Sequence, residues 1–189
     1  MDIPLGGKRG EGLAAKIDIL DFALVAAHKW VLFGREESRS RYASAIIDGQ
    51  VVLMHRLLTN APEGVQVDHI DGDGLNNRRE NLRLCTRSQN TINRRPNRTI
   101  AGKLPLSDYK GVVQQRESPK RPWIARIRCN GKRFTLGGYK TEVDAAMAYD
   151  AAARYLHGEF ANTNFNGSLA LPVEEIRRRS RTYGTVQIT

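Results

Sequence analysis

Short apolar runs separated by turn-forming residues dominate the first third of the chain. Residues 30–33, 42–47 and 51–53 are mostly apolar and rich in residues typical of strands. Asp48-Gly49 separates the last two runs, and this dipeptide favours a two-residue hairpin turn. The pattern therefore predicts a small sheet. Residues 1–16 are rich in glycine and show no periodicity, so we interpret them as a flexible tail.

A strand, a loop, a second strand and a helix are predicted between residues 65 and 93. The first strand runs into a Gly-Asp-Gly sequence at 72–74, which supplies the backbone freedom of a tight turn. Residues 82–84 alternate between apolar and charged side chains, as a half-buried strand does. Thr86 and Gln89 match the capping box of a helix amino terminus, which indicates a helix directly after them.

A second patterned block extends from residue 109 to residue 165. Its central feature is a hairpin in which Asn130-Gly131 joins two alternating runs, and the two-residue turn sets Arg128 opposite Arg133. Thr141 is expected to cap a helix that ends near His157-Gly158. Small side chains on this helix would let it pack closely on the apolar face of the hairpin: Ala145, Ala146, Ala148, Ala151, Ala152 and Ala153.

The two faces of this hairpin differ in character. The apolar face is formed by Trp123, Ala125, Ile127, Phe134 and Leu136. The opposite face presents Arg126, Arg128, Arg133 and Thr135. Two arginines directly opposite each other repel in a free sheet, so the pair indicates a polyanionic partner. The alternative is that the two arginines bind no partner and that solvent screens the repulsion between them.

The remaining segments separate and follow the two blocks. Residues 94–108 are basic, contain two prolines and lack periodicity, so we interpret them as a linker. Residues 166–189 form a basic carboxy-terminal tail. The predicted modules are therefore 17–93 and 109–165, and the fold class is α+β.

The positive charge of the chain is unevenly distributed. The 30 Lys and Arg residues exceed the 20 Asp and Glu residues, and residues 1–65 are neutral, so the net charge of +10 arises entirely beyond residue 65. A local basic surplus is typical of a nucleic-acid-binding protein, although a solvated basic surface is the alternative.

Other classes of protein fit the composition poorly. Cys85 and Cys129 are too few and too far apart for a disulfide framework or a structural zinc site, so no structural zinc is expected. No apolar run reaches the roughly 18–20 residues that a membrane helix needs, and residues 8–18 do not resemble a signal peptide. We expect a cytoplasmic, nucleoid-associated protein without a membrane partner. The sequence leaves its oligomeric state open, with a monomer favoured.

The Asp68-His69 pair could support phosphodiester hydrolysis. This reaction needs a base that activates water and a divalent cation that polarises the phosphate. His69 suits the base because histidine titrates near neutral pH. Asp68 offers a carboxylate oxygen, and Asn90 offers an amide oxygen from the predicted helix. Such hard oxygen donors favour Mg²⁺ over zinc.

These residues resemble the motif of HNH endonucleases, particularly the homing nucleases of phages and mobile introns. The match comprises Asp68-His69, Asn81 and Asn90. Two adjoining segments are also similar to the family: Asn76-Asn77-Arg78 and Asn81-Leu82-Arg83. The resemblance implies a ββα-metal fold, in which two strands and a helix surround one metal ion.

Residue roles follow from the same resemblance. It implies that His69 is the general base, that Asn81 orients His69 through a hydrogen bond to its ring nitrogen, and that Asp68 and Asn90 hold the metal. Asparagine rather than histidine at the third position favours one Mg²⁺ or Mn²⁺ ion. His55 precedes the motif as in many phage-type members, so it is expected near the site.

The second block resembles the AP2 DNA-binding domain over residues 109–165. Matching segments are Tyr109-Lys110-Gly111-Val112, Trp123-x-Ala125-x-Ile127, Leu136-Gly137, Ala145-Ala146-x-Ala148-Tyr149-Asp150 and Asn162-x-Asn164-Phe165. The resemblance implies a three-stranded antiparallel sheet packed on one helix and laid in the major groove. It implies DNA contacts from Lys110, Gln115, Arg126, Arg128, Arg133, Thr135 and Tyr149.

The sequence thus predicts a metal-dependent endonuclease that cuts double-stranded DNA. A homing-type or phage-encoded, site-selective enzyme is expected, acting in a bacterial or phage-infected cell. The principal alternative is a sequence-specific DNA-binding regulator whose HNH fold is inactive. An RNA-directed nuclease is a third hypothesis.

Overall fold

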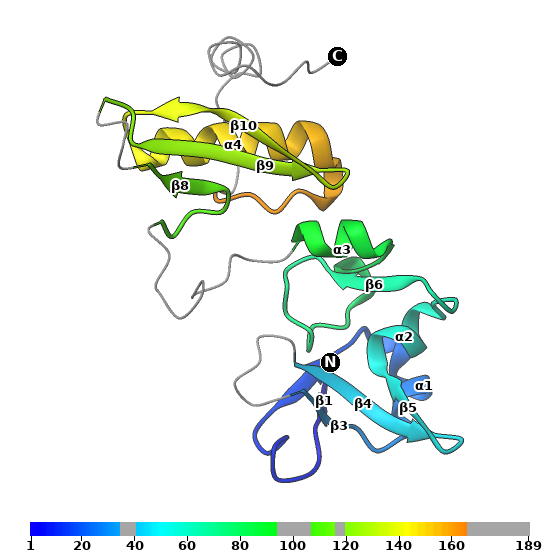
Figure 1. Cartoon of the computed structure of the whole chain (residues 1–189). Helices are drawn as coiled ribbons and strands as arrows, with labels where there is room; N and C mark the ends of the chain where they lie inside the picture. Colours follow the sequence, from blue (N-terminus) through cyan, green and yellow to red (C-terminus); the bar gives the residue numbers. More distant parts are fainter. Residues whose placement is uncertain (35–40, 94–106, 116–119, 166–189) are drawn as a thin grey trace. The chain divides into compact units, whose positions relative to one another are not determined.

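The chain forms two compact units, Met1–Thr91 and Ile92–Thr189 (Figure 1). The computed structural model describes residues 1–34, 41–93, 107–115 and 120–165. Small antiparallel sheets and short helices make up both units, as expected for a mixed α+β fold. Among the described residues, every helix is too short or too polar to cross a lipid bilayer.

The amino-terminal segment is folded, and the prediction of a flexible tail over residues 1–16 was wrong. Strand β1 (Asp2–Pro4) pairs with β2 (Ala14–Lys16) in an antiparallel ladder. Leu5 and Ala15 are buried in the core of the first unit. Three-residue strands carry too little alternation to be seen as a pattern, which explains the error.

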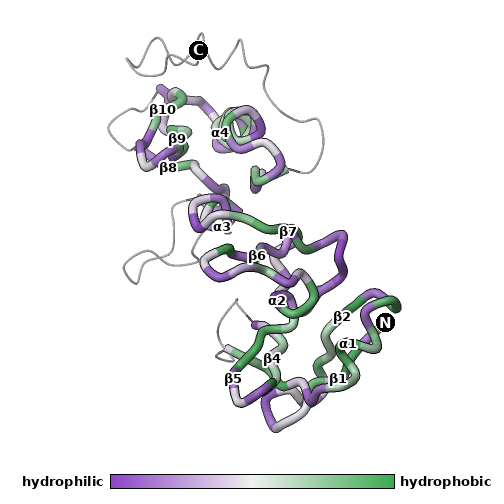
Figure 2. Tube along the Cα trace, turned by 90° about the vertical axis from the view of Figure 1, so that its right-hand side faces the viewer, coloured by the Kyte–Doolittle hydropathy of each residue, from purple (hydrophilic) through white to green (hydrophobic). Residues whose placement is uncertain are grey.

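A second sheet follows in the first unit, with the strand order β3-β4-β5. Its elements and the flanking helices are the 3-10 helix η1 (Ile19–Asp21), α1 (Phe22–Ala26), β3 (Val31–Phe33), β4 (Tyr42–Ile47), β5 (Gln50–Leu53) and α2 (Met54–Thr59). The predicted hairpin turn is confirmed, because Asp48 and Gly49 both have positive φ angles, 50° and 76°. α1 is hydrophobic throughout (Figure 2), and Phe22 and Leu24 remain exposed.

The strand–loop–strand–helix pattern expected between residues 65 and 93 is present. Its elements are β6 (Gln66–His69), η2 (Arg79–Asn81), β7 (Leu82–Cys85) and α3 (Arg87–Asn93). β6 and β7 pair antiparallel, with His69 opposite Leu82 and Asp68 opposite Arg83. The capping box is confirmed: the Thr86 backbone N–H donates to Gln89 Oε1 at 2.8 Å, and the Gln89 N–H donates to Thr86 Oγ1 at 3.3 Å.

The amino-terminal strand β2 is attached to the loop between β6 and β7. The Lys16 N–H donates to the carbonyl of Leu75 at 2.8 Å, and the Asn77 N–H donates to the carbonyl of Lys16 at 2.8 Å. Nearby, Arg79 donates three side-chain hydrogen bonds to the buried carboxylate of Asp21. The loop between β6 and β7 is therefore held in place by residues outside it, namely Lys16 and Asp21.

The second unit contains a three-stranded antiparallel sheet covered on one face by a helix (Figure 1). Its elements are β8 (Val112–Gln114), β9 (Trp123–Cys129), β10 (Lys132–Tyr139), α4 (Glu142–His157) and η3 (Gly158–Phe160). The predicted hairpin register is confirmed, including Arg128 opposite Arg133. Thr141 caps α4 by accepting a hydrogen bond from the Asp144 N–H at 3.1 Å.

The core between this sheet and α4 is built from small side chains. All six alanines of α4 named above are buried against Ala125, Ile127 and Leu136. Gly111 lets the backbone approach the Tyr149 ring of α4 closely, since a Cβ atom at this position would lie 2.0 Å from that ring. A register irregularity between Thr135 and Gly137 interrupts the β9–β10 ladder.

The linker predicted at 94–108 lies outside the described residues except for Ser107 and Asp108. The tail predicted at 166–189 lies entirely outside them.

Candidate functional site

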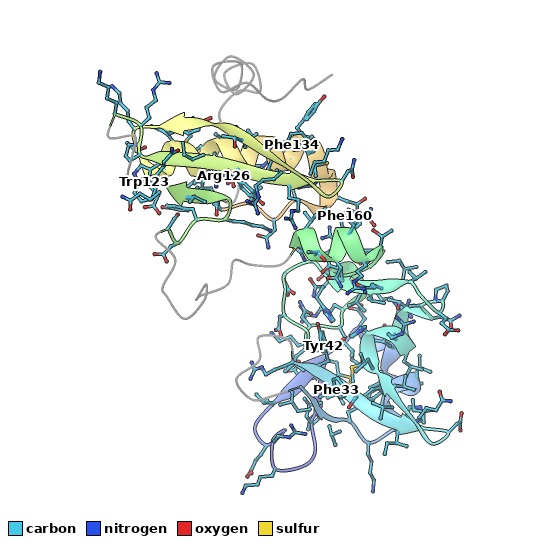
Figure 3. The ribbon with its side chains drawn as sticks, in the orientation of Figure 1. Phe33, Tyr42, Trp123, Arg126, Phe134 and Phe160 are labelled. Carbon is cyan, nitrogen blue, oxygen red and sulfur yellow. The ribbon has the colours of Figure 1, made fainter. Side chains whose placement is uncertain are left out.

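His69 lies at the end of β6 in a buried cluster of aromatic rings. Its side chain is only 5% exposed. The centroids of the His69 and His55 rings are 5.0 Å apart, with the ring planes at 88°. The Tyr42 ring lies 5.8 Å from that of His69 and 5.1 Å from that of His55. Figure 3 labels Tyr42, which belongs to β4. Strand β4 and helix α2 therefore enclose the imidazole that the motif supplies.

Asn77 provides a hydrogen-bond partner of the His69 ring. The distance from His69 Nε2 to Asn77 Oδ1 is 3.3 Å, and Asn77 is completely buried. Its amide nitrogen donates to the carbonyl of Leu75 at 3.1 Å. In the sequence, Asn77 is recognisable only as part of the family pattern, which assigns it no role.

Asn81, which we expected to orient His69, instead shapes the loop beyond it. Its amide nitrogen donates to Asp71 Oδ1 at 3.0 Å and to the carbonyl of Asn76 at 2.7 Å. Its oxygen accepts the Asp71 backbone N–H at 3.0 Å. Both ends of this amide are thus used within the loop, and the expected contact with the His69 ring is replaced by that of Asn77.

The surroundings of His69 favour its neutral form. Burial lowers the pKa of its imidazole below the ordinary value. The hydrogen bond with Asn77 and the negative charges of Asp71, Asp68 and Asp73 act in the opposite direction without overcoming the burial. A neutral imidazole can accept a proton, as a general base must.

His55 lies in the first turn of α2 and is buried to the same degree as His69. Burial, together with the nearby charges of His69 and Arg56, lowers the pKa of His55 to about 3. Its buried Nδ1 atom has no hydrogen-bond partner in the described parts of the chain. The ring therefore stays neutral at physiological pH and packs edge-on against His69.

Asp68 forms a buried ion pair with the residue opposite it on β7. Arg83 donates to Asp68 Oδ2 from Nε at 3.0 Å and from Nη2 at 2.7 Å. The two side chains are 6% and 11% exposed, Asp68 being the less exposed. The pair joins the two strands at the level of the site.

The second expected metal ligand, Asn90, reaches the same strand from α3. Its amide nitrogen donates to Gln66 Oε1 at 2.7 Å. Gln66 and Asp68 are two positions apart on β6 and therefore share one face of that strand. A carboxamide held by its nitrogen presents its oxygen, so Asp68 and Asn90 offer the donor atoms that a hard divalent cation prefers. Among the described residues no cluster of three or more His, Cys, Asp or Glu side chains could hold a metal.

The basic face of the second unit carries four of the expected DNA contacts. Arg128 and Arg133 are exposed as a cross-strand pair, and Arg126 and Thr135 form the next pair, half-buried. Arg126 extends from β9, the strand that begins at Trp123 (Figure 3).

The other three expected contacts lie elsewhere in the unit. Tyr149 is buried on α4 beneath Gly111, and burial raises the pKa of its phenol. Burial lowers the pKa of Lys110 to about 8, and its ammonium donates to the carbonyl of Ile92. Gln115 follows β8 and is half-buried, with its backbone N–H donating to the carbonyl of Pro122. Lys110 and Gln115 are therefore half-buried, as Arg126 and Thr135 are, and only Tyr149 is buried.

Comparison with known proteins defines the class of the first unit. Residues 60–92 match the model of a family described as HNH endonuclease. A mimivirus protein named "Uncharacterized HNH endonuclease L560", from Acanthamoeba polyphaga mimivirus, is 32% identical over 161 residues, which cover 82% of this chain and 77% of that protein. The chain belongs to the HNH endonuclease family.

Plant proteins match a shorter part of the chain. The "AP2/ERF and B3 domain-containing transcription repressor TEM1" of Arabidopsis thaliana is 42% identical over 71 residues, 38% of this chain and 19% of that protein. The "Dehydration-responsive element-binding protein 2D" of the same plant is 48% identical over 63 residues, 32% of this chain and 29% of that protein. The chain thus joins an HNH endonuclease module to an AP2-like module, and it spans less than a third of either plant relative.

Proposed function

We propose that this chain is a metal-dependent endonuclease that hydrolyses phosphodiester bonds in double-stranded DNA. The observation that carries the proposal is the state of His69: a buried, neutral imidazole at the end of β6, beside Asp68 and with Asn90 on the following helix. This hydrolysis needs a base and a divalent cation, and the Asp68 carboxylate and the Asn90 amide offer oxygen ligands for such a cation.

In the proposed reaction His69 removes a proton from water, and the resulting hydroxide attacks the phosphorus as the bond to the leaving sugar oxygen breaks. Asp68 and Asn90 would hold one Mg²⁺ or Mn²⁺ ion in a ββα-metal arrangement within residues 17–93. The bound ion supplies positive charge that stabilises the developing oxyanion. Asn81 acts indirectly, because its amide fixes the loop that carries Asp71 and Asn76.

The AP2-like module, residues 109–165, is proposed to bind duplex DNA and to select the site. Its exposed Arg128 and Arg133 would contact phosphates or guanine edges, both of which guanidinium groups recognise in a bidentate manner. Arg126 and Thr135 extend this face, and Lys110, Gln115 and Tyr149 are proposed as further DNA contacts. A homing-type or phage-encoded enzyme remains part of the proposal, and the mimivirus relative described above is an example of a viral HNH endonuclease.

A plasmid-nicking assay tests the proposal. Supercoiled DNA should be cut in the presence of Mg²⁺ but not in EDTA, and His69→Ala should abolish cutting while DNA affinity stays within about twofold of wild type. His28→Ala is the matched control, since His28 lies outside the ring cluster. Cutting by His69→Ala at the wild-type rate would exclude His69 as the base.

A second candidate function is regulation by DNA binding alone, with an inactive HNH fold. The names of the plant relatives, which include a transcription repressor, favour it. Specific DNA binding without cleavage at any concentration of Mg²⁺ or Mn²⁺ would support this candidate over the endonuclease.

A further inference from the structure

Asn77 is the most deeply buried side chain in the loop that carries the site. It is completely buried, and its backbone N–H donates to the carbonyl of Lys16 on β2 at 2.8 Å. Its side-chain amide lies between the carbonyl of Leu75 and the ring of His69. Asn77 therefore links the amino-terminal strand to His69.

The orientation of the Asn77 amide is fixed by the atoms on either side. A backbone carbonyl can only accept a hydrogen bond, so the group facing Leu75 must be the amide nitrogen. The amide oxygen then faces His69 Nε2. Exchanging the two ends would set the oxygen against the Leu75 carbonyl, and two acceptors would face each other in a buried place.

This orientation determines which ring nitrogen of His69 carries hydrogen. An amide oxygen cannot donate, so His69 Nε2 must be the donor in the 3.3 Å contact. In the neutral imidazole the other nitrogen, Nδ1, then holds the lone pair.

We propose that Asn77 is a positioning residue that holds neutral His69 in the Nε2–H tautomer, so that Nδ1 is the atom that accepts the proton from water. The proposal rests on the proposed function for the role of His69 as a base, but the tautomer itself can be measured without any cleavage. β2 contributes through Lys16, whose backbone groups fix both Leu75 and Asn77.

Nitrogen-15 NMR of the full chain, labelled at its four histidines, tests the tautomer directly. The spectrum is recorded at about pH 8, where neutral imidazole predominates. The His69 resonances are assigned as those lost in His69→Gln. We expect the chemical shifts of a protonated Nε2 and an unprotonated Nδ1. A protonated Nδ1 in the wild-type chain would overturn the proposal.

Two neighbouring substitutions separate positioning from general loosening of the loop. Asn77→Ala should give His69 a mixture of tautomers and lower kcat at least about tenfold with KM nearly unchanged, as loss of an orienting partner does in other enzymes. Asn76→Ala is the matched control: it removes the hydrogen bond from Asn76 to Asp71 in the same loop but leaves the contact with His69. It should keep the Nε2–H tautomer.

Asn77→Asp provides a second test, since a carboxylate also accepts from Nε2–H, although it loses the hydrogen bond to the Leu75 carbonyl and is expected to lower stability. This variant should retain the tautomer that Asn77→Ala loses. Wild-type tautomer in Asn77→Ala, or equal loss of tautomer in Asn76→Ala, would overturn the proposal. If instead His69→Ala cuts plasmid normally while the tautomer is as expected, the proposed function fails and the structural role of Asn77 stands.

Discussion

At the scale of single residues, His55 makes the first unit less stable at acidic pH. The pKa of its ring is lowered to about 3 by burial and by the charges of His69 and Arg56, whereas an exposed histidine titrates near 6.5. Between these two values the unfolded chain binds a proton that the folded chain does not. The contribution of neutral His55 to the free energy of unfolding is therefore fully present above pH 6.5 and is lost as the pH falls toward 3.

We predict that His55→Gln flattens this dependence. The free energy of unfolding of the wild-type chain should fall more steeply, by up to about 1.4 kcal/mol per pH unit relative to the variant, between pH 6 and pH 4. Urea titrations in a Trp123→Phe background measure it, because Trp30 then reports on the first unit alone. Parallel curves for the two chains would show that His55 is accessible to protons in the folded state.

A second residue-scale prediction concerns Asn90. Asn90→Ala should raise the Mg²⁺ concentration needed for half-maximal cutting by roughly 10- to 100-fold, since one oxygen donor is lost. The cost in stability should be near 1 kcal/mol for the lost hydrogen bond to Gln66. Thr91→Ala, on the exposed side of the same helix, is the control and should leave the metal requirement unchanged. Substituting Asp68 would be a less clean test of metal binding, because it would leave the buried charge of Arg83 without its ion-pair partner Asp68.

The sequence indicates candidate residues for the site but not the contacts that they make. Asp68, His69 and Asn90 are recognisable from residue type and spacing. The roles of the loop asparagines could not be separated, because any of three neighbouring amides could reach an imidazole and only the folded loop decides which does. Tyr42 had no signal at all, since its approach to His69 depends on β4 passing beneath Gly74, where a Cβ atom would meet the Tyr42 ring at 2.6 Å.

At the scale of elements, predictability follows the strength of local turn and cap signals. The β9–β10 register was predictable because Asn130-Gly131 allows one two-residue turn, with φ angles of 48° and 76°. α3 and α4 were predictable from their caps. β1 and β2 were missed because their pairing is held by buried contacts of Leu5 and Ala15 rather than by any local pattern.

The arginine pair on β9 and β10 yields an element-scale prediction. Arg128→Ala should weaken duplex DNA binding and reduce the slope of log K against log salt by about 0.9, the amount expected for one lost phosphate contact. It should also stabilise the free hairpin slightly, because Arg133 no longer faces a like charge. Binding titrations at several salt concentrations provide the slope. Lys140→Ala removes the same charge outside this face, and a slope change confined to that control would contradict the assignment.

At the scale of the whole molecule, two compact units correspond to two proposed tasks. A chain shortened to residues 1–100 should still nick plasmid with Mg²⁺, because His69, Asp68 and Asn90 all precede the cut. It should bind DNA more weakly and distribute its cuts over many positions. Mapping of cleavage sites on a long duplex measures the change, and unchanged site choice would assign selection to the first unit instead.

The attachment of β2 to the loop has a consequence for anyone who builds chimaeric nucleases from this chain. The segment that matches the family model, residues 60–92, looks like a portable cassette. It lacks Lys16, whose backbone anchors Asn77, and it also lacks Tyr42 and His55, which enclose the His69 ring. A chimaera that contains only residues 60–92 would keep every residue of the motif but lose the residues that support the His69 imidazole. The transferable part begins at the first strand.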